Sequence, residues 1–361
     1  MMQLADLRCY AVARSLFPPT DVSGAIARLG FVQADPIRAP ARAQDLVLRH
    51  RVGDYRAGDL DRLYPALDVE EDFFVNYGFL PRAHYALMHP RSVRGAWSPA
   101  RRKRAQAVLE FVRARGEVHP RDVEESFGHG AVVNDWGGSS NATTHLLDAM
   151  HYRGMLRVVR RENGIRIYGV RPPCDPPADA AERARRLDAL IDVAVRKYAP
   201  LPAESLAPLL RRLRFGAPQW RRGLDGALAR AKRRLAHARI DGVEWYWPEG
   251  EHPQAARDAI DGDVRLLAPF DPIVWDRARF ERLWGWAYRF EAYTPARKRK
   301  LGYYALPMLW RETVVGWANL AVEDGSMRSD TGYVTGAAPR SRGFRAALQA
   351  ELDRMRVFLR L

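Results

Sequence analysis

The spacing of apolar residues along the chain predicts short helices joined by short extended segments. Near the N-terminus it predicts helices over residues 4–15 and 22–29, and Gly30 is typical of a helix C-terminus. Residues 31–35 then have the pattern of an extended segment. Pro36 supports this interpretation, because proline confines the residue before it to extended backbone.

Two polar residues in this segment are candidates for catalysis. Alternate side chains of an extended segment share a face, so Gln33 and Asp35 are expected to point the same way, about 7 Å apart at the backbone. An amide beside a carboxylate could hold and polarise one water molecule. The alternative is the edge of an ordinary turn with two solvated polar residues, and the spacing alone favours that alternative.

The middle of the chain has the pattern of a winged helix, which is three helices followed by a β-hairpin. Asn163-Gly164 between two β-rich segments is a strong hairpin signal. The third helix has candidate N-cap residues in Ser139-Ser140-Asn141. The predicted elements are helices over 98–116, 119–127 and from 141, and strands over 155–161 and 165–170.

A winged helix places its third helix in the major groove of DNA and its hairpin along the backbone. Polar residues at the start of the third helix and arginines on the hairpin are therefore the candidate DNA contacts. They are Ser140, Asn141, Thr143 and Thr144, and Arg157, Arg160, Arg161 and Arg166. Winged helices also bind proteins, but this much arginine favours DNA.

The rest of the chain repeats the plan once more and then changes character. A proline-rich linker at 172–177 precedes helices over 185–198, 203–213 and 224–239 and a strand over 243–247. From residue 264 we expect a small β-domain with a short helix over 276–283, strands over 288–293, 302–309 and 313–322, and a closing helix over 339–361.

The predicted fold class is therefore α+β, with tandem winged-helix modules followed by a small C-terminal antiparallel β-barrel-like domain. The expected boundaries are an N-terminal winged-helix-like module at 1–95, a central winged helix at 96–172, a third such module at 181–250 and the β-domain at 264–361.

Charge points to a polyanionic partner. The 361 residues include 58 Lys and Arg against 43 Asp and Glu, a formal net charge of +15. Part of the excess forms a dense basic run: Arg91, Arg94, Arg101, Arg102, Lys103, Arg104, Arg113 and Arg115. A second basic cluster, Arg297-Lys298-Arg299-Lys300, is either a phosphate contact or a solvated loop.

Several function classes lack support in the sequence. The two cysteines, Cys9 and Cys174, are far apart, which fits a reducing cytoplasm better than a disulfide framework. The nine histidines form no metal-ligand spacing, and no phosphate-binding glycine motif occurs, so we expect no metal and no cofactor. We see neither a signal peptide nor an apolar run of membrane-spanning length, and expect no membrane partner.

Several motifs, in order, resemble the AlkZ/YcaQ-like family of winged-helix DNA glycosylases over nearly the whole chain. They are Val32-Gln33-Ala34-Asp35 with Ile37, Arg42 and Leu46-Val47-Leu48; Trp136-Gly137-Gly138-Ser139 with Ala142-Thr143-Thr144; Arg153-Gly154; Leu266 to Trp275; and Tyr293-Thr294-Pro295 with Gly302-Tyr303-Tyr304.

The resemblance implies a concave DNA-binding surface and a catalytic Gln-x-Asp pair, here Gln33 and Asp35. Arg38 and Arg42 after the pair and Arg153 before the wing become candidate DNA contacts. The implied reaction is hydrolysis of the N-glycosidic bond of N7-alkylated, cationic purines, with bulky adducts or interstrand crosslinks among the substrates. No lysine lies beside the pair in the sequence to form a Schiff base, so we expect a monofunctional glycosylase. The implied partner is double-stranded DNA bound largely without sequence preference, by a monomer, in the cytoplasm at the nucleoid.

Two other classes of function stay open on the sequence. The family's Glu-x-Trp-x-His stretch has no match in residues 73–78, which marks an outlying member and leaves room for a non-catalytic winged-helix regulator. Regulators commonly dimerise on palindromes, and no heptad-like dimerisation helix is apparent. A protein-interaction scaffold is the second alternative, and the +15 charge disfavours it.

Overall fold

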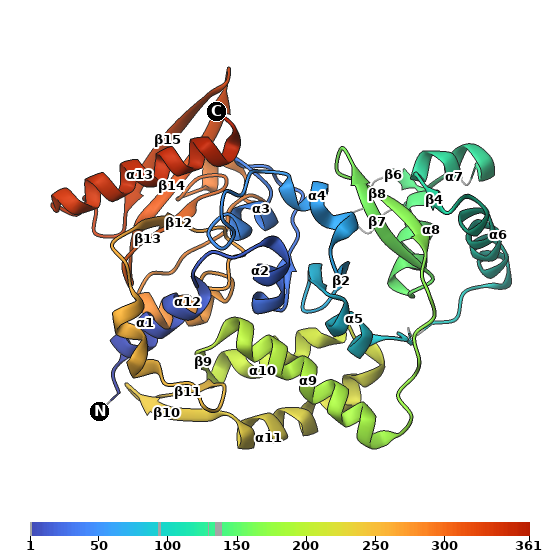
Figure 1. The fold of residues 1–361 in the computed structure, drawn as a ribbon, viewed down its shortest axis with the longest axis horizontal. Helices are drawn as coiled ribbons and strands as arrows, with labels where there is room; N and C mark the ends of the chain where they lie inside the picture. The colour runs from blue at the N-terminus through green and yellow to red at the C-terminus, as the bar shows by residue number, and fades with distance from the viewer. Residues whose placement is uncertain (1, 93–94, 129, 134–138) are drawn as a thin grey trace. The chain divides into compact units, whose positions relative to one another are not determined.

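The structure, a computed structural model, describes residues 2–92, 95–128, 130–133 and 139–361, and for 131–133 and 139–140 the backbone alone. The fold mixes helices with small antiparallel sheets (Figure 1). It forms two compact units, each built from several segments. Unit 1 comprises 1–59, 191–210 and 228–361, and unit 2 comprises 60–190 and 211–227. The four modules expected from the sequence stay a prediction.

Unit 1 begins as the apolar spacing predicts. Helices α1 (Leu4–Ser15) and α2 (Val22–Leu29) are followed by strand β1 (Val32–Gln33) and helix α3 (Ala43–Leu48). Gly30 ends α2 in the left-handed conformation at φ 69°, which glycine adopts without strain. The apolar face of α2 is buried, so the chain enters β1 at a fixed position.

The C-terminal part of unit 1 is a four-stranded antiparallel sheet with a helix packed on it, as expected. The strand order is β12 (Val264–Leu266), β13 (Leu306–Trp310), β14 (Thr313–Glu323) and β15 (Ser326–Tyr333). Helix α13 (Arg342–Leu359) lies along this sheet in Figure 1, and Phe344 contacts the rings of Trp310 and Tyr333 edge-on.

Two sequence predictions for unit 1 need correction. The helix expected to run to residue 239 ends earlier, because β10 (Ala236–Ile240) pairs with β11 (Val243–Trp247) around a tight turn at Asp241 and Gly242. That Asp-Gly pair is the signal that we overlooked. The third strand of this small sheet is β9 (Leu201–Pro202).

The strand expected over 288–293 is not formed. Tyr288 instead packs into the core: its ring contacts Phe280 and Trp286, and its hydroxyl donates to the Ala305 carbonyl at 2.8 Å. Glu291 accepts hydrogen bonds from the amides of Lys300 and Leu301. The alternating apolar pattern of residues 288–293 therefore reflects side-chain packing within a loop, and these residues do not pair as a β-strand.

Unit 2 contains the three helices and the hairpin in the predicted order. They are α6 (Pro99–Arg115), α7 (Pro120–Phe127), α8 (Ala142–Tyr152), β7 (Leu156–Glu162) and β8 (Ile165–Val170). Asn163 and Gly164 both have positive φ, as the predicted turn requires. The sheet also contains β4 (Glu117–Val118), in the order β4-β8-β7. Its winged-helix assignment stays a prediction.

A further hairpin in unit 2 was missed by the sequence analysis. It pairs β2 (Val69–Phe73) with β3 (Tyr77–Pro81) and is followed by α5 (Arg82–Met88). Strand β2 contains three consecutive acidic residues, Glu70, Glu71 and Asp72, and all three are buried. Their charge gave the segment the sequence pattern of a solvent-exposed stretch. The remaining longer helices are α9 (Ala180–Tyr198), α10 (Ala203–Arg211), α11 (Leu224–Arg234) and α12 (Arg277–Trp284).

Two kinds of feature are absent from the described residues. No helix among them is both long and apolar enough to cross a membrane. Their His, Cys, Asp and Glu side chains form no cluster of three that could hold a metal ion.

Candidate active site and DNA-contact residues

The Gln33–Asp35 pair is not solvated. Gln33 is 4% exposed to solvent and Asp35 is 9% exposed. Phe31 and Val32, which lie in the sequence between α2 and this pair, are fully buried. Burial of the segment on both faces anchors the two polar side chains at the edge of the unit 1 core. The alternative of an ordinary solvated turn edge therefore does not describe this segment.

Gln33 is held by an aromatic donor from a distant part of the chain. The indole Nε1 of Trp275 donates to Oε1 of Gln33 at 2.8 Å. Because the carbonyl oxygen takes this bond, the amide nitrogen remains as a donor, and it has no hydrogen-bond partner among the described residues. Gln33 can therefore present an N–H group to a water molecule.

The Asp35 carboxylate has no cationic partner among the described side chains. Its Oδ1 accepts a 2.9 Å hydrogen bond from the Ile37 amide, and its own amide donates to Oε1 of the buried Gln44 at 3.3 Å. Burial raises the pKa of Asp35, and the hydrogen bond from Ile37 opposes part of this rise. The carboxylate is therefore ordered without being neutralised.

Tyrosines lie within the electrostatic reach of Asp35. Burial and then the charge of Asp35 raise the pKa of both Tyr293 and Tyr304. Tyr304 is buried, and its hydroxyl has no hydrogen-bond partner among the described residues. Tyr293 is 78% exposed, and both rings meet Phe290 edge-on. The side of the site near Asp35 is therefore aromatic and partly open.

The loop that carries Trp275 is fixed by a buried ion pair. Arg51 contacts both carboxylate oxygens of Asp271 at 2.8 and 3.1 Å, and both side chains are fully buried. Asp271 also accepts from the amide of Ile273. These contacts give a structural reason for the Pro269-Phe270-Asp271-Pro272 motif, since they hold the loop against α3 and so place Trp275 on Gln33.

Lys197 is a residue near the site that the sequence did not reveal. Its Nζ donates to the carbonyl of Phe31, two residues before Gln33, although 166 residues separate the two in the chain. The ammonium is buried, and burial lowers the pKa of Lys197 to about 7. The sequence analysis found no lysine beside the pair, because this contact arises only from the tertiary fold.

The candidate DNA contacts on the hairpin of unit 2 are engaged in ion pairs within the protein. Arg161 binds both oxygens of the buried Glu71, and Arg166 binds Glu71 and Asp148. The remaining two arginines pair as well, Arg157 with Glu70 at 3.0 Å and Arg160 with Glu117 at 2.8 Å. Much of the positive charge expected to face phosphate thus compensates carboxylates of the same unit.

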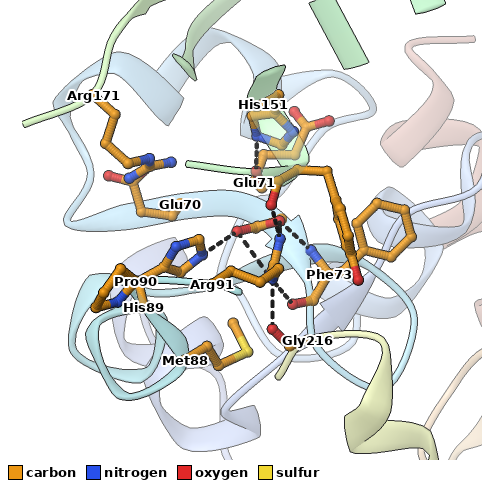
Figure 2. Close-up of polar contacts among 12 residues, drawn as sticks. Glu70, Glu71, Phe73, Met88, His89, Pro90, Arg91, His151, Arg171 and Gly216 are labelled. Atoms are coloured by element: carbon orange, nitrogen blue, oxygen red, sulfur yellow. Dashed lines mark hydrogen bonds and ion pairs between the residues drawn. The ribbon is translucent and has the colours of Figure 1, made fainter. Parts of the chain in front are cut away.

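The carboxylates of β2 form the centre of a larger buried network, drawn in Figure 2. Arg91 and His89 converge on Asp72, at 3.1 Å from Nη1 of Arg91 to Oδ1 and 3.0 Å from Nε2 of His89 to Oδ2. Although burial favours the neutral acid, the charge of Arg91 and the bond from His89 hold the pKa of Asp72 below its ordinary range. Arg91, the first residue of the dense basic run, is therefore buried in this network and is not available to bind a phosphate.

At the start of the third helix, the predicted residues have different positions. Asn141 caps α8 by accepting from the Thr144 amide at 3.1 Å, and Thr144 is exposed. Thr143 is buried and its hydroxyl donates to Glu124, which places it away from the surface. The Ser140 side chain and the Trp136-Gly137-Gly138 stretch lie outside the described residues, as does Arg94.

Other basic residues are exposed and without a carboxylate partner. Helix α6 presents Arg101, Arg102, Lys103 and Arg104, which form no ion pair in the described part of the chain. Arg101 and Arg104 line an open groove of about 400 Å³ together with Ala142, His145 and Leu146 of α8. Trp97 beside it contacts the guanidinium groups of Arg101 and Arg153. This groove is the phosphate-contact candidate in unit 2.

Unit 1 contributes its own candidates. Arg38, three residues after Asp35, is exposed and has no ion-pair partner within the described residues, while Arg42 is partly buried. The second basic cluster lies on a short 3-10 turn, Ala296–Lys298. Arg297, Lys298 and Lys300 are exposed, and Arg299 donates to the Thr294 carbonyl and lies over the Tyr303 ring.

Comparison with known proteins gives the chain its family. A solved structure, the Streptomyces sahachiroi DNA glycosylase AlkZ, matches with a TM-score of 0.60 over 99% of this chain and 96% of that one, at 13% identity. At this identity the likeness supports the fold. Residues 26–358 match the DNA glycosylase AlkZ-like family, which is nearly the whole chain. The protein described here therefore belongs to the AlkZ-like family of DNA glycosylases.

Proposed function

We propose that this DNA glycosylase removes N7-alkylated purines from duplex DNA, with Asp35 and Gln33 as its catalytic residues. The observation that carries the proposal is the Asp35 carboxylate, which is nearly buried, ordered by one backbone amide and unpaired with any described cation. Such a carboxylate can stabilise a positive charge that develops near it. DNA repair is the role that the family membership supports.

The chemistry of the substrate explains why one carboxylate is enough. Alkylation at N7 makes the purine cationic, so the base leaves without prior protonation and no general acid is needed. The sugar then develops oxocarbenium character, which Asp35 stabilises, in contrast to glycosidases that need two carboxylates. Asp35 and the amide N–H of Gln33 together orient the attacking water, and Asp35 accepts its proton.

Substrate size follows from the surroundings of the pair. Tyr293 is largely exposed, so the site is partly open on the side nearest to Asp35. An open site accepts bulky adducts and crosslinked bases, which a closed base-flipping pocket would exclude. We therefore include bulky N7 adducts and interstrand crosslinks among the substrates.

Single-turnover release of N7-methylguanine from duplex DNA tests the assignment. Asp35→Asn keeps the shape and removes the charge, so the rate should fall about a hundredfold or more, which corresponds to about 3 kcal/mol. The control is Asp21→Asn, which removes an exposed carboxylate at the start of α2 and keeps a capping oxygen. A normally folded and fully active Asp35→Asn protein would rule out the assignment.

We also propose that the enzyme is monofunctional. Lys197 is buried, and its ammonium donates to the carbonyl of Phe31, two residues before Gln33. Borohydride should therefore trap no covalent complex between the wild type and abasic-site DNA. Trapping that is lost in Lys197→Met would assign a lyase activity to this lysine. Sequence-selective binding by an inactive wild type would instead favour the regulator.

A further inference from the structure

A cavity of about 250 Å³ in unit 1 is lined with cationic side chains from three helices. Arg14 comes from α1, Arg28 from α2, and Arg196 and Lys197 from the end of α9. The lining carboxylate is Glu251, and Tyr10 completes the polar wall. The volume is large enough for one phosphate group with several waters, since a liquid water takes about 30 Å³.

The carboxylate in this cavity is already compensated. Glu251 forms an ion pair with Arg14 and accepts a 2.6 Å hydrogen bond from the Tyr10 hydroxyl. Arg14 also donates to the Arg196 carbonyl at 2.8 Å, which holds the pair against α9. Glu251 and Arg14 therefore largely compensate each other, and Glu251 forms an ion pair with neither Arg28 nor Arg196 among the described contacts.

Three cations of the cavity have no carboxylate partner among the described residues. The Arg28 guanidinium lies 4.3 Å from the Phe17 ring centre and makes no hydrogen bond there. Arg196 donates to a backbone carbonyl, that of Asp192. Lys197 donates to the Phe31 carbonyl, although a lysine ammonium has three N–H donors. The wall thus presents unused donors to one space, and Arg28 and Arg196 add positive charge that no described carboxylate pairs with.

Like charges gathered around a cavity raise its free energy unless an anion is bound there. Burial and then the charge of Arg14 lower the pKa of Arg28, and the charge of Glu251 opposes part of this change. Guanidinium and ammonium groups together are the usual ligands of phosphate oxygens. A carboxylate ligand is smaller and carries one charge, so it would compensate less of this set.

We propose that this cavity is a phosphate-binding pocket, in which Arg28 and Arg196 bind the phosphate oxygens at the mouth and Lys197 binds from the floor. The proposal is independent of the glycosylase reaction. The phosphate comes either from the DNA backbone or from a free phosphate or phosphorylated small molecule. Lys197 contacts the Phe31 carbonyl in the segment that leads to Gln33, and Arg28 lies in the last turn of the helix before it, so an occupant would brace that segment from the side of α2.

The test uses Arg28→Gln combined with Arg196→Gln, because both side chains are exposed and their replacement spares the core. The matched control is Arg345→Gln, an exposed arginine of α13 with no side-chain partner in the described residues. Binding of inorganic phosphate is measured by thermal shift and by ³¹P line broadening, against chloride at the same ionic strength. The double variant should bind phosphate about tenfold more weakly or worse, and the control should match the wild type.

Undamaged duplex DNA identifies the source of the phosphate. If the pocket takes a backbone phosphate, inorganic phosphate competes with DNA and the double variant binds DNA several-fold more weakly than the control does. If it takes a free phosphate, DNA affinity matches the control while the phosphate effect is lost. Either outcome supports the pocket. Equal phosphate binding by the wild type, the control and the double variant would overturn it.

Discussion

The indole Nε1 of Trp275 donates a 2.8 Å hydrogen bond to Oε1 of Gln33, across 242 residues of sequence. This bond fixes which end of the amide faces the candidate water, because the oxygen is occupied and the nitrogen is not. A glutamine side chain without such a partner would rotate, and either end could face the water. We therefore treat Trp275 as a positioning residue for Gln33.

Trp275→Phe tests this relationship. The substitution keeps an aromatic ring to pack against Tyr198, whose ring centre lies 4.6 Å away, and removes the N–H donor. Loss of one hydrogen bond of about 1–1.5 kcal/mol should slow single-turnover base release by about tenfold. Thermal melting and DNA affinity should change little. In Gln33→Ala, which has no amide left to orient, the same substitution should have no further effect on the rate.

DNA binding should depend on α6 more than on the hairpin. Arg101 and Arg104 are exposed and line the groove beside α8, whereas Arg160 is paired with Glu117 and Glu162. Replacing Arg101 and Arg104 together by Gln should flatten the salt dependence of binding by about two units, similarly on unrelated sequences. Arg160→Gln serves as the control and should change the slope by less than one unit. If Arg160→Gln changed the salt dependence more than the Arg101 and Arg104 variant does, the hairpin would be the main DNA-binding element.

Arg161 should matter for stability. Its partner Glu71 is fully buried, so Arg161→Met leaves a carboxylate whose remaining side-chain partners among the described residues are Arg166 and the Tyr77 hydroxyl. We expect a loss of about 2–4 kcal/mol in the free energy of unfolding. Its neighbour Arg160 is half-exposed, and the same substitution there should cost less than about 1 kcal/mol.

A double variant checks the cause of that loss. Combining Arg161→Met with Glu71→Gln removes the buried charge along with its partner, so part of the stability should return. Urea unfolding of the four proteins measures this coupling. If the double variant is as unstable as the sum of the single ones, packing and not charge compensation explains the role of Arg161.

Unit 2 should lose stability in acid because of His89. Burial lowers the pKa of His89 to about 4, against the opposing bond to Asp72. Between pH 6.5 and 4 the unfolded chain therefore binds a proton that the folded chain does not, and stability falls as the pH falls. The effect is on the order of 2–3 kcal/mol for this group.

His89→Gln separates this contribution from other acid effects. Glutamine can still donate to Asp72 and does not titrate, so the variant should lose less stability than the wild type between pH 7 and 4.5. Denaturant unfolding at the two pH values supplies the comparison. Parallel losses in both proteins would place the acid sensitivity in other groups.

What the sequence predicted well rests on local signals. Gly30 at the end of α2 and Asn163-Gly164 at the tip of the hairpin need nothing beyond neighbouring residues, because backbone sterics decide their conformation. The Gln33–Asp35 segment was found for the same reason. The helix end before this segment and the proline after it determine where the segment begins and ends.

What the sequence could not predict depends on contacts between distant segments. The partners of Gln33 and Phe31, Trp275 and Lys197, reach them only in the folded unit. In β2 the local pattern of three acids suggested solvent exposure. Their burial depends on partners elsewhere in the chain, which include the arginines at 82, 91, 157, 161, 166 and 171. The identity of a charged residue shows that it is polar, but it does not show whether a partner of opposite charge will allow its burial.

The buried acids of β2 restrict how this part of the protein can evolve. A change at Glu70, Glu71 or Asp72 alone leaves one or more arginines without a counter-charge, and a change in an arginine does the reverse. Either first step produces a less stable intermediate, so neutral drift at one position is blocked until a second substitution accompanies it. These positions should therefore covary among relatives as a set, while a change in one exposed arginine of α6 leaves no buried carboxylate without a counter-charge.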